Sequence, residues 1–507
     1  MPLSVHPTGT VAPTDLPTDG AAARASQAGV ETPVPQAVPC WRVQREPPTF
    51  EHEPSPRESR GLWALFYTVT LQRSSLRRAA VWNPNPSVTS TPSPSDSAPR
   101  ELHGASPLGA VLAFSALASF AAGTATLSIF FVTAREPYSF TPLQQYALGL
   151  LVGVAYTLGA LGASRVGRAF RSAGGSSRGL IARLSVTMAA LLCLPLFTHR
   201  DGSVFVLLAL YAPLTGCFWP LIEGYVSGGR RAGELRSAMG SFNVTWSLTL
   251  LASFFVPPLF ADSFRTVFVI LALTHVASVL ALRGFRREPG AHDLGQHAAE
   301  QHGAEKHAVP AGYPEFLRVH RVLHAMSYLV MYALSPYLPR LLERLGLTGF
   351  GASALAASWL LARSLTFVVL GRWHGWHGRW SVAVVGTLFV LGGFGATLLA
   401  PGLGTGAIPV VALGLFVFGA GLAALYTAAL YYAFEVGGHE GGGSHEALIG
   451  LGYSIGPACG LLVLGLERGE YVAADRRDVA LLVVITVLCL GAALFAWQRR
   501  RAPSRST

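Results

Sequence analysis

Charged residues are scarce in this chain of 507 residues. They make up 13% of the sequence, whereas soluble globular domains carry about 25%. Hydrophobic residues make up 51%. A soluble core does not keep growing to this length with so few charges to cover it. The composition excludes an ordinary soluble protein and predicts an integral membrane protein.

Lysine is nearly absent: among the lysines and arginines, every residue except Lys306 is an arginine. The net charge of +11 would suit a nucleic-acid partner if the basic residues formed a continuous face. They instead form short clusters between apolar runs, as charges that set membrane topology do. We therefore expect no nucleic-acid partner.

Cysteine is also scarce, and no two cysteines form a CxxC pair. Four of the five lie in apolar runs, which is typical of small buried side chains. The five are Cys40, Cys193, Cys217, Cys459 and Cys489. We expect neither a disulfide framework nor a metal site.

Two catalytic motifs are missing. No GxxxxGK[ST] phosphate loop occurs, so ATP is not the expected energy source and no cofactor is expected. His-Glu occurs twice, at 439–440 and 445–446, but neither pair continues to the HExxH of zinc hydrolases. Glycines follow the first pair, and Ile449 stands where the second histidine would be needed. The sequence predicts no enzyme.

Residues 1–105 are rich in Pro, Ser, Thr and Ala. Such a segment buries too little apolar surface to order itself, so we predict a disordered cytoplasmic tail. Its residues 61–78 have an apolar part too short to span a bilayer, followed by arginines. This piece is either a basic helix on the membrane surface or a transiently helical part of the tail.

From residue 106 onward the chain is a series of apolar runs of roughly 20 residues, enough to cross about 30 Å of hydrocarbon. Only helices and closed barrels span lipid, and these runs are longer than barrel strands. The sequence predicts an all-α polytopic membrane protein with twelve transmembrane helices. Their approximate limits are 108–133, 143–163, 179–198, 203–226, 239–260, 264–283, 317–337, 351–371, 380–400, 408–434, 446–466 and 478–497.

The arginines between these runs predict an orientation with both chain ends inside. Loops that would then be cytoplasmic carry more arginines than the opposite loops. The longest hydrophilic break, 286–315, separates two six-helix halves at 106–285 and 316–500, and a short cytoplasmic tail follows at 501–507. Four evenly spaced histidines in this linker are expected to be solvated rather than metal-bound.

One cytoplasmic stretch carries a family resemblance. The stretch 158–170, LGALGASRVGRAF, resembles G-x-x-x-D-R-x-G-R-R/K, the signature between helices two and three of major facilitator transporters. Arg165, Gly167 and Arg168 stand at matching positions, whereas Ser164 replaces the aspartate and Ala160 the first glycine. At the related place in the second half, GRWHGWHGRW repeats the Gly-Arg pair at Gly378 and Arg379.

Two further stretches look like a bacterial branch of the same superfamily: FWPLIEGYVSGG running into GSFNVTWS, and LYTAALYYAFEVGG running into HEALIGLGYSIGP. The resemblance covers residues 106–500. It implies two parallel six-helix repeats around a central site. The implied function is secondary active transport of a small solute by alternating access.

Without an ATP site, a gradient of an ion, with protons the expected one, would drive this transport. We expect a monomer in the cytoplasmic membrane whose partners are a solute, protons and the lipid bilayer. Three alternatives stay open: a lipid flippase, a nutrient sensor with the tail as signalling arm, and a membrane-embedded enzyme. The enzyme would need a nucleophile or paired acids in loops that are short here.

Charged residues inside apolar spans are candidates for the transport pathway. Glu223 follows Pro220, which is expected to kink its helix. Glu223 either carries the coupling proton or pairs with a loop arginine near the cytoplasmic end. Arg363 is the most isolated charge, and it either binds an anionic substrate group or pairs with an acid. His324 either titrates or is a satisfied buried histidine.

Polar and aromatic residues complete the candidate set. Trp219 and Trp246 offer flat faces to a solute, Asn243 offers hydrogen bonds, and Tyr426 lies deep in its span. For Trp219, Trp246 and Asn243, packing between helices or at the membrane interface explains the same residue types equally well.

Glu446 opens span eleven, where an acid suits the helix N-terminus and where Ser444 is expected to cap it. In major facilitators, the aspartate between helices two and three faces this point as a cytoplasmic latch. We therefore predict that Glu446 pairs with Arg165 or Arg168 in the outward-facing conformation, within a gate that also includes Gly167 and Arg379. Small residues at 452, 456 and 460 predict close packing against a neighbouring helix.

Overall fold

A computed structural model provides the fold. It describes residues 104–198, 201–230, 232–261, 263–290, 310, 312–437 and 442–500, and every regular element within these ranges is a helix. Several predicted features lie outside the described residues: the tail up to residue 103, the surface helix at 61–78, the linker histidines and the tail 501–507. The side chain of Ser444 also lies outside the description.

The first six predicted spans are helices, and some are continued by a short extra segment. Their bounds are α2 Leu108–Gly123 with η2 Thr124–Ser128 and α3 Ile129–Thr133, α4 Pro142–Ser172, α5 Ser177–Leu192 with α6 Leu194–Phe197, α7 Asp201–Ser227, α8 Ala232–Ser253 with α9 Val256–Leu259, and α10 Phe264–Ala281 with η3 Leu282–Gly284.

The last six predicted spans are helices as well. Their bounds are α12 Tyr313–Leu334 with α13 Leu338–Arg344, α14 Gly349–Arg372, α15 Ser381–Leu399 with η4 Ala400–Gly406, α16 Ala407–Gly437, α17 Gly442–Arg468, and α18 Arg477–Arg499 preceded by η6 Ala474–Arg476.

Ten candidate membrane spans within the described ranges meet criteria of length and hydropathy. One of them, 381–433, covers both α15 and α16, and α12 is not among the ten. Glu315, Arg318 and Arg321 lie near the start of α12. The all-helical, multi-pass membrane protein is confirmed, while the count of twelve crossings and the N-in/C-in orientation stay predictions.

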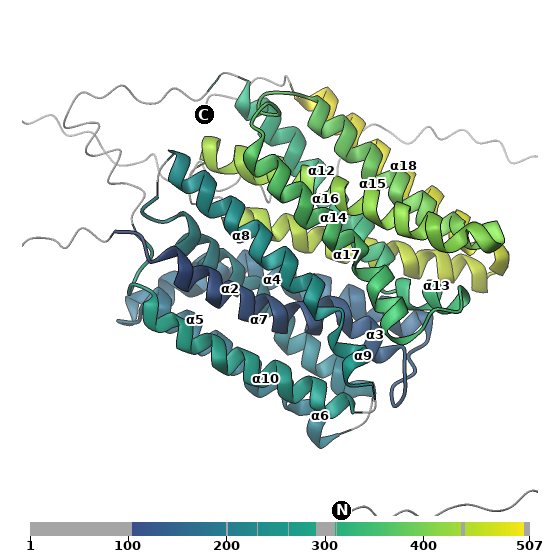
Figure 1. Cartoon of the computed structure of the whole chain (residues 1–507), viewed down its shortest axis with the longest axis horizontal. Coiled ribbons are helices and arrows are strands. Elements are labelled where there is room, and N and C mark those ends of the chain that lie inside the picture. Colours follow the sequence, from purple (N-terminus) through teal and green to yellow (C-terminus); the bar gives the residue numbers. More distant parts are fainter. Residues whose placement is uncertain are drawn as a thin grey trace, which may run out of the picture. The chain divides into compact units, whose positions relative to one another are not determined.

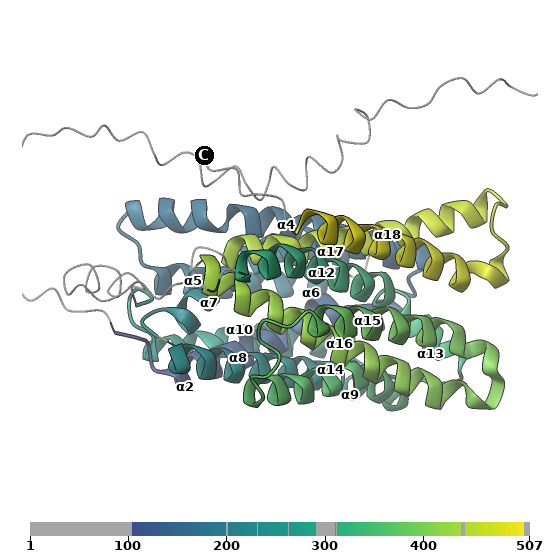
Figure 2. The ribbon, with the colours of Figure 1, turned by 90° about the horizontal axis from the view of Figure 1, so that it is seen from above.

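The two sets of helices meet along two seams. Figure 1 shows α2 to α10, in purple to teal, on one side and α12 to α18, in green to yellow, on the other. In the view from above, α4 lies beside α17 along one margin and α8 beside α14 along the other (Figure 2), and both pairs are in contact. The space between the seams is where a central site can form.

Glycines let these helices approach closely. A Cβ atom on Gly153 of α4 would lie 2.4 Å from the carbonyl oxygen of Tyr453 in α17. On another face of α17, Cβ atoms on Gly452 and Gly456 would lie 2.5 Å and 2.3 Å from carbonyl oxygens of α12. Backbones this close tolerate no side chain. The predicted close packing is confirmed, with Gly460 facing the ring of Tyr146.

The signature stretch is helical rather than a loop, because α4 continues to Ser172. Gly167 is therefore an ordinary helical residue, whereas Gly378 lies in the turn between α14 and α15 with a φ of +69°, which favours glycine. The backbone N–H of Gly378 donates to the hydroxyl of Tyr432 at 2.9 Å. The two Gly-Arg pairs are thus alike in sequence but not in backbone conformation.

We expect Gly456→Ala to destabilise the protein, because the new methyl group would meet the Leu329 carbonyl oxygen at 2.3 Å. Overpacking of this kind costs about 1–3 kcal/mol. Gly465→Ala on the same helix is the matched control, since nothing lies within 4 Å of its added Cβ. Thermal unfolding of both variants in detergent measures the difference, and equal melting temperatures would contradict this packing.

The N-in/C-in orientation predicts opposite labelling of two exposed loop positions. Glu470→Cys, between α17 and α18, should react with a membrane-impermeant maleimide on intact cells. Ala173→Cys, directly after α4, should react only after permeabilisation. The reverse pattern would invert the orientation.

Candidate functional site

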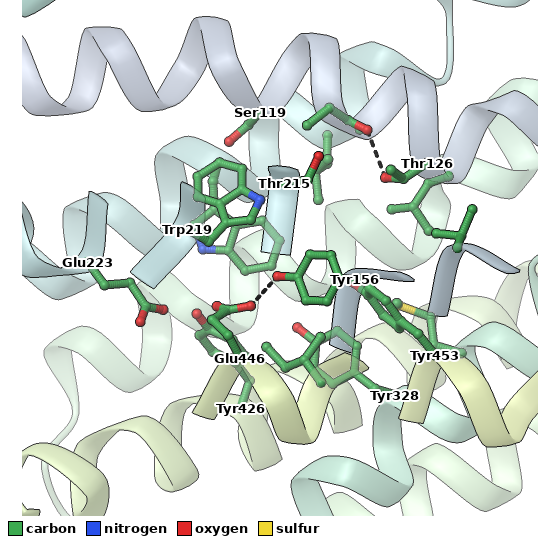
Figure 3. A pocket seen from close by; sticks show the side chains of 18 of the residues that line it. Ser119, Thr126, Tyr156, Thr215, Trp219, Glu223, Tyr328, Tyr426, Glu446 and Tyr453 are labelled. Atoms are coloured by element: carbon green, nitrogen blue, oxygen red, sulfur yellow. Dashed lines mark hydrogen bonds between the residues drawn. The ribbon is translucent and has the colours of Figure 1, made fainter. Parts of the chain in front are cut away.

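A small cavity of about 90 Å³ lies between the two seams (Figure 3). Helices of both sets line it, namely α2 with η2, α4, α7 and α8 from the first, and α12, α14, α16 and α17 from the second. Its polar and aromatic lining residues are Ser119, Thr126, Tyr156, Thr215, Trp219, Glu223, Phe242, Trp246, Tyr328, Arg363, Tyr426, Glu446 and Tyr453.

The structure brings most of the predicted pathway residues together here. Five of the seven line the cavity: Trp219, Glu223, Trp246, Arg363 and Tyr426. The remaining two, Asn243 and His324, are buried directly behind it, in contact with lining residues. Glu446, which was predicted in the gate, lines the cavity as well.

Two carboxyl groups meet at one end of the cavity. Glu223 of α7 and Glu446 of α17 are 4% and 5% exposed, and their carboxyl groups lie within hydrogen-bonding reach of each other. Figure 3 shows them pointing toward one another. Tyr156 of α4 donates a hydrogen bond to Oε2 of Glu446, whereas Oε2 of Glu223 has no protein donor. We refer to Glu223 and Glu446 as the carboxyl pair.

The predicted contact between Glu446 and the signature arginines is not formed in this conformation. Arg165 and Arg168 are exposed on the last turns of α4, while Glu446 points inward. No ion pair among the described residues joins them. Residue 446 lies on the face of α17 that packs on α4 and α7, so Tyr156 rather than an arginine reaches it. The latch pairing in the outward-facing conformation stays a prediction.

The rest of the predicted gate does not extend the cavity. Arg379 is exposed in the turn before α15, and Gly167 is buried within α4. Beside Arg379, the ring of His377 stacks on Tyr431 with centroids 4.2 Å apart. Partial burial, together with nearby His374 and Arg236, lowers the pKa of His377 to about 4. His377 is therefore neutral at physiological pH and adds no charge to this turn.

Close packing of α4 on α7 places the carboxyl pair. A Cβ on Gly216 of α7 would lie 2.2 Å from the carbonyl oxygen of Tyr156, and a Cβ on Gly159 of α4 would lie 2.0 Å from that of Pro213. Glu223 lies about two turns beyond Gly216 along α7. This close contact between the two backbones thus sets the position of Tyr156 on α4 relative to Glu223 on α7.

Arg363 of α14 is 1% exposed and forms no ion pair with any acid of the described chain. Its Nη2 donates to the hydroxyl of Tyr328 at 2.7 Å. Its guanidinium lies 4.3 Å from the ring centroid of Trp246 and 5.3 Å from that of Tyr426. Its Nε has no acceptor among the residues that the structure describes. Aromatic faces attract this cation, but they do not neutralise it.

Hydrogen bonds from α8 hold this arrangement. Nε1 of Trp246 donates to Oδ1 of Asn243 at 3.3 Å, so Asn243 orients the indole that covers Arg363. Ser364 of α14 donates to Ser247 of α8 at 2.9 Å and links the two helices next to Arg363. Asn243 therefore supports the cavity wall rather than forming it.

Three buried histidines lie behind the carboxyl pair. The rings of His324 and His445 stack at 4.5 Å between centroids, and His324 also contacts Tyr426 at 5.3 Å. His320 lies one turn away from His324 on α12 and stacks on Tyr432. Both ring nitrogens of His320 and His324, and Nε2 of His445, have no hydrogen-bond partner in the part of the chain that the structure describes. In the described part of the chain, no group of three or more ligating side chains could hold a metal ion.

The first helix of the cavity wall changes its winding where it meets the site. The helical turn widens to a π-helix over Thr124–Ser128, between α2 and α3. Thr126 and Leu127 of this segment line the cavity, and the carbonyl oxygen of Thr126 accepts a hydrogen bond from Tyr332 of α12 at 3.3 Å. Such turns are frequent at functional sites.

Sequence reasoning missed several residues of the site, among them Tyr156, Tyr453 and His445. Tyr156 and Tyr453 line the cavity, and His445 stacks behind it. The two tyrosines stand among small and apolar residues where a polar ring has no obvious local use, and this was the available signal. The rings of Tyr332 and Tyr453 stack at 3.7 Å, a contact that sequence spacing does not show.

Comparison with solved structures shows the same fold in transporters of low sequence identity. A nucleoside transporter, NupG, has a TM-score of 0.54 and 12% identity, with 77% of this chain and 99% of that chain covered. A bacterial homolog of the human lysosomal transporter Spinster, inward-facing and occupied, has a TM-score of 0.53 and 17% identity, covering 78% and 96%. A POT family transporter in complex with 5-aminolevulinic acid has a TM-score of 0.54 and 15% identity, covering 77% and 96%.

No curated protein matches the chain significantly in sequence. The family model of the Major Facilitator Superfamily, in contrast, matches residues 112–461, which is more than half of the chain. This range includes all lining residues of the cavity. The chain therefore belongs to the Major Facilitator Superfamily and is a membrane transporter of solutes.

Proposed function

We propose that this protein is a secondary active transporter that moves a small solute by alternating access and couples transport to protons through the carboxyl pair. The proposal places it as a monomer in the cytoplasmic membrane, with a solute, protons and lipid as partners and without nucleic acid or cofactor. No catalytic residues are assigned, in keeping with a family whose members typically transport rather than transform.

The observation that carries the proton coupling is the contact between Glu223 and Glu446. Two carboxylates in a water-poor interior repel each other, and neither forms an ion pair with an arginine or lysine of the described ranges. A hydrogen bond between two carboxyl groups requires that one of them hold a proton. We therefore assign one shared proton to the pair in this conformation.

The origin of the two acids supports coupling to movement. Glu223 comes from the first six long helices and Glu446 from the last six, and Tyr156 joins Glu446 to the first set again. In a rocking movement of one half against the other, these groups would separate and each would meet water. The shared proton would then lose its second partner, so opening of the site and proton release would occur together.

The solutes named for the similar structures are all small: nucleosides for one and 5-aminolevulinic acid for another. The polar groups of this chain lie in an internal cavity lined by both sets of helices. That placement suits a small solute better than a lipid, for which the polar groups would line a groove open to the membrane. No observation favours the nutrient-sensor alternative, whose signalling arm would be the N-terminal segment outside the described residues.

The test of the function is transport into proteoliposomes. Purified protein would be offered a panel of radiolabelled small anions, cations and neutral solutes, with and without an imposed pH gradient. The proposal expects at least one solute to accumulate only when the gradient is present. Gradient-independent equilibration of every transported solute would contradict the proton coupling, and specific binding of lipid without transport would favour the flippase.

We expect Glu223→Gln to abolish gradient-driven accumulation while it leaves solute exchange intact, because glutamine keeps the hydrogen bond to Glu446 but cannot release a proton. Glu446→Gln should behave in the same way. Glu470→Gln, an exposed acid in the loop after α17, is the control and should accumulate solute like the wild type. Accumulation by both cavity variants at the wild-type level would remove the carboxyl pair from the coupling.

A further inference from the structure

We propose that the substrate is a small organic monoanion with a flat apolar body, that its carboxylate binds Arg363, and that it enters the site together with one proton. This inference rests on the proposed transport function and adds the substrate class and the proton stoichiometry. Its basis is the balance of buried charge among Arg363, Glu223 and Glu446.

Arg363 carries a positive charge in the cavity, and no acid of the described chain forms an ion pair with it. Among the described residues, its guanidinium has one hydrogen-bonded neighbour, the neutral hydroxyl of Tyr328, and its buried Nε has no acceptor. A guanidinium stays protonated in proteins, so this charge cannot be removed by losing a proton. A buried charge of this kind is retained where an anion completes it.

The carboxyl pair differs, because it can adjust its own charge. With one shared proton it carries a charge of −1, which offsets Arg363 across the cavity without touching it. Tyr328, Tyr426 and Tyr453 each lie within electrostatic reach of both Arg363 and Glu446, which places the two opposite charges around one space. With one proton on the pair, Arg363 and the carboxyl pair therefore sum to zero charge.

An anion that binds Arg363 changes this sum to −1. In a buried site that excess charge is costly, and one additional proton on the carboxyl pair removes it. The step is balanced: the proton comes from water, it forms an O–H bond on the remaining carboxylate of the pair, and no bond of the substrate breaks. Anion and proton thus enter the site in a ratio of one to one, with no net charge moved.

The aromatic lining defines the rest of the substrate. The indole of Trp246 lies over the guanidinium, and Trp219, Tyr426 and Tyr453 line the same small cavity. Rings of this kind bind a planar apolar group through stacked or edge contacts. A carboxylate on a short flat body would therefore reach Arg363 while its ring remains among these side chains.

The experiment compares three isosteric probes that differ in charge: benzoate, benzamide and benzylamine. Binding to the full-length protein in detergent is followed by quenching of tryptophan fluorescence. We expect benzoate to bind at least about tenfold more tightly than either other probe, a difference of about 1.4 kcal/mol. Equal or tighter binding of benzamide or benzylamine would overturn the assignment of a monoanion.

Two variants test the role of Arg363. Arg363→Gln should lower the affinity for benzoate at least about tenfold and leave that for benzamide nearly unchanged. Arg372→Gln, an exposed arginine at the end of the same helix, is the matched control and should bind like the wild type. A melting temperature is recorded for each variant, and the charge series on the wild-type protein decides the question if Arg363→Gln does not fold.

Proton uptake is measured separately, with a pH-sensitive dye in weakly buffered solution at neutral pH. Addition of benzoate should remove about one proton per bound benzoate from solution, and the double variant Glu223→Gln/Glu446→Gln, in which no carboxylate of the pair remains, should abolish the uptake. Binding of benzoate without uptake would overturn the stoichiometry. If the transport panel responds to the pH gradient but benzoate does not bind, the substrate class is wrong and the proposed function stands. If benzoate binds with proton uptake but no solute of the transport panel accumulates in response to the pH gradient, the proposed transport function is wrong instead.

Discussion

One arginine and two glutamates, buried between the two sets of helices, constrain the rest of the molecule. An isolated charge in a low-dielectric interior costs several kcal/mol or more, so each must meet a partner, a proton or a ligand. Glu223 and Glu446 meet each other, and Arg363 meets tyrosine and tryptophan rings. The packing around them has to exclude lipid on every side and still let the surrounding helices move.

Glycine contacts satisfy the first half of this requirement. Gly159 and Gly216 bring α4 against α7, while Gly153 and Gly450 bring α4 against α17. Since these contacts consist largely of backbone, they fix the distance and rotation of the helices more tightly than flexible side chains would. The faces of α4, α7 and α17 that carry Tyr156, Glu223 and Glu446 then meet at the cavity. The α8–α14 seam is held differently, by the serine pair next to Arg363.

The same interface explains why binding, protonation and movement belong to one process in the proposed mechanism. Helices of both sets line the cavity. A solute held by Arg363 of α14 would contact side chains of α2, α7 and α8 as well, and the proton proposed for the carboxyl pair would bridge α7 and α17. Any separation of the two sets of helices would change the solute site at Arg363 and the proton site at the carboxyl pair together. This is the physical requirement for coupled transport.

The sequence by itself determined the membrane class, the helical spans, the family resemblance and five of the lining residues. Length and hydropathy are local properties, and a charge such as Arg363 or Glu223 inside an apolar run is costly wherever the helix packs. Only the tertiary structure decided that Glu446 faces Glu223 and Tyr156 rather than the signature arginines. The sequence places residue 446 at a helix start, but the rotation of α17 about its axis follows from glycine contacts with α4 and α12, which join residues more than a hundred positions apart.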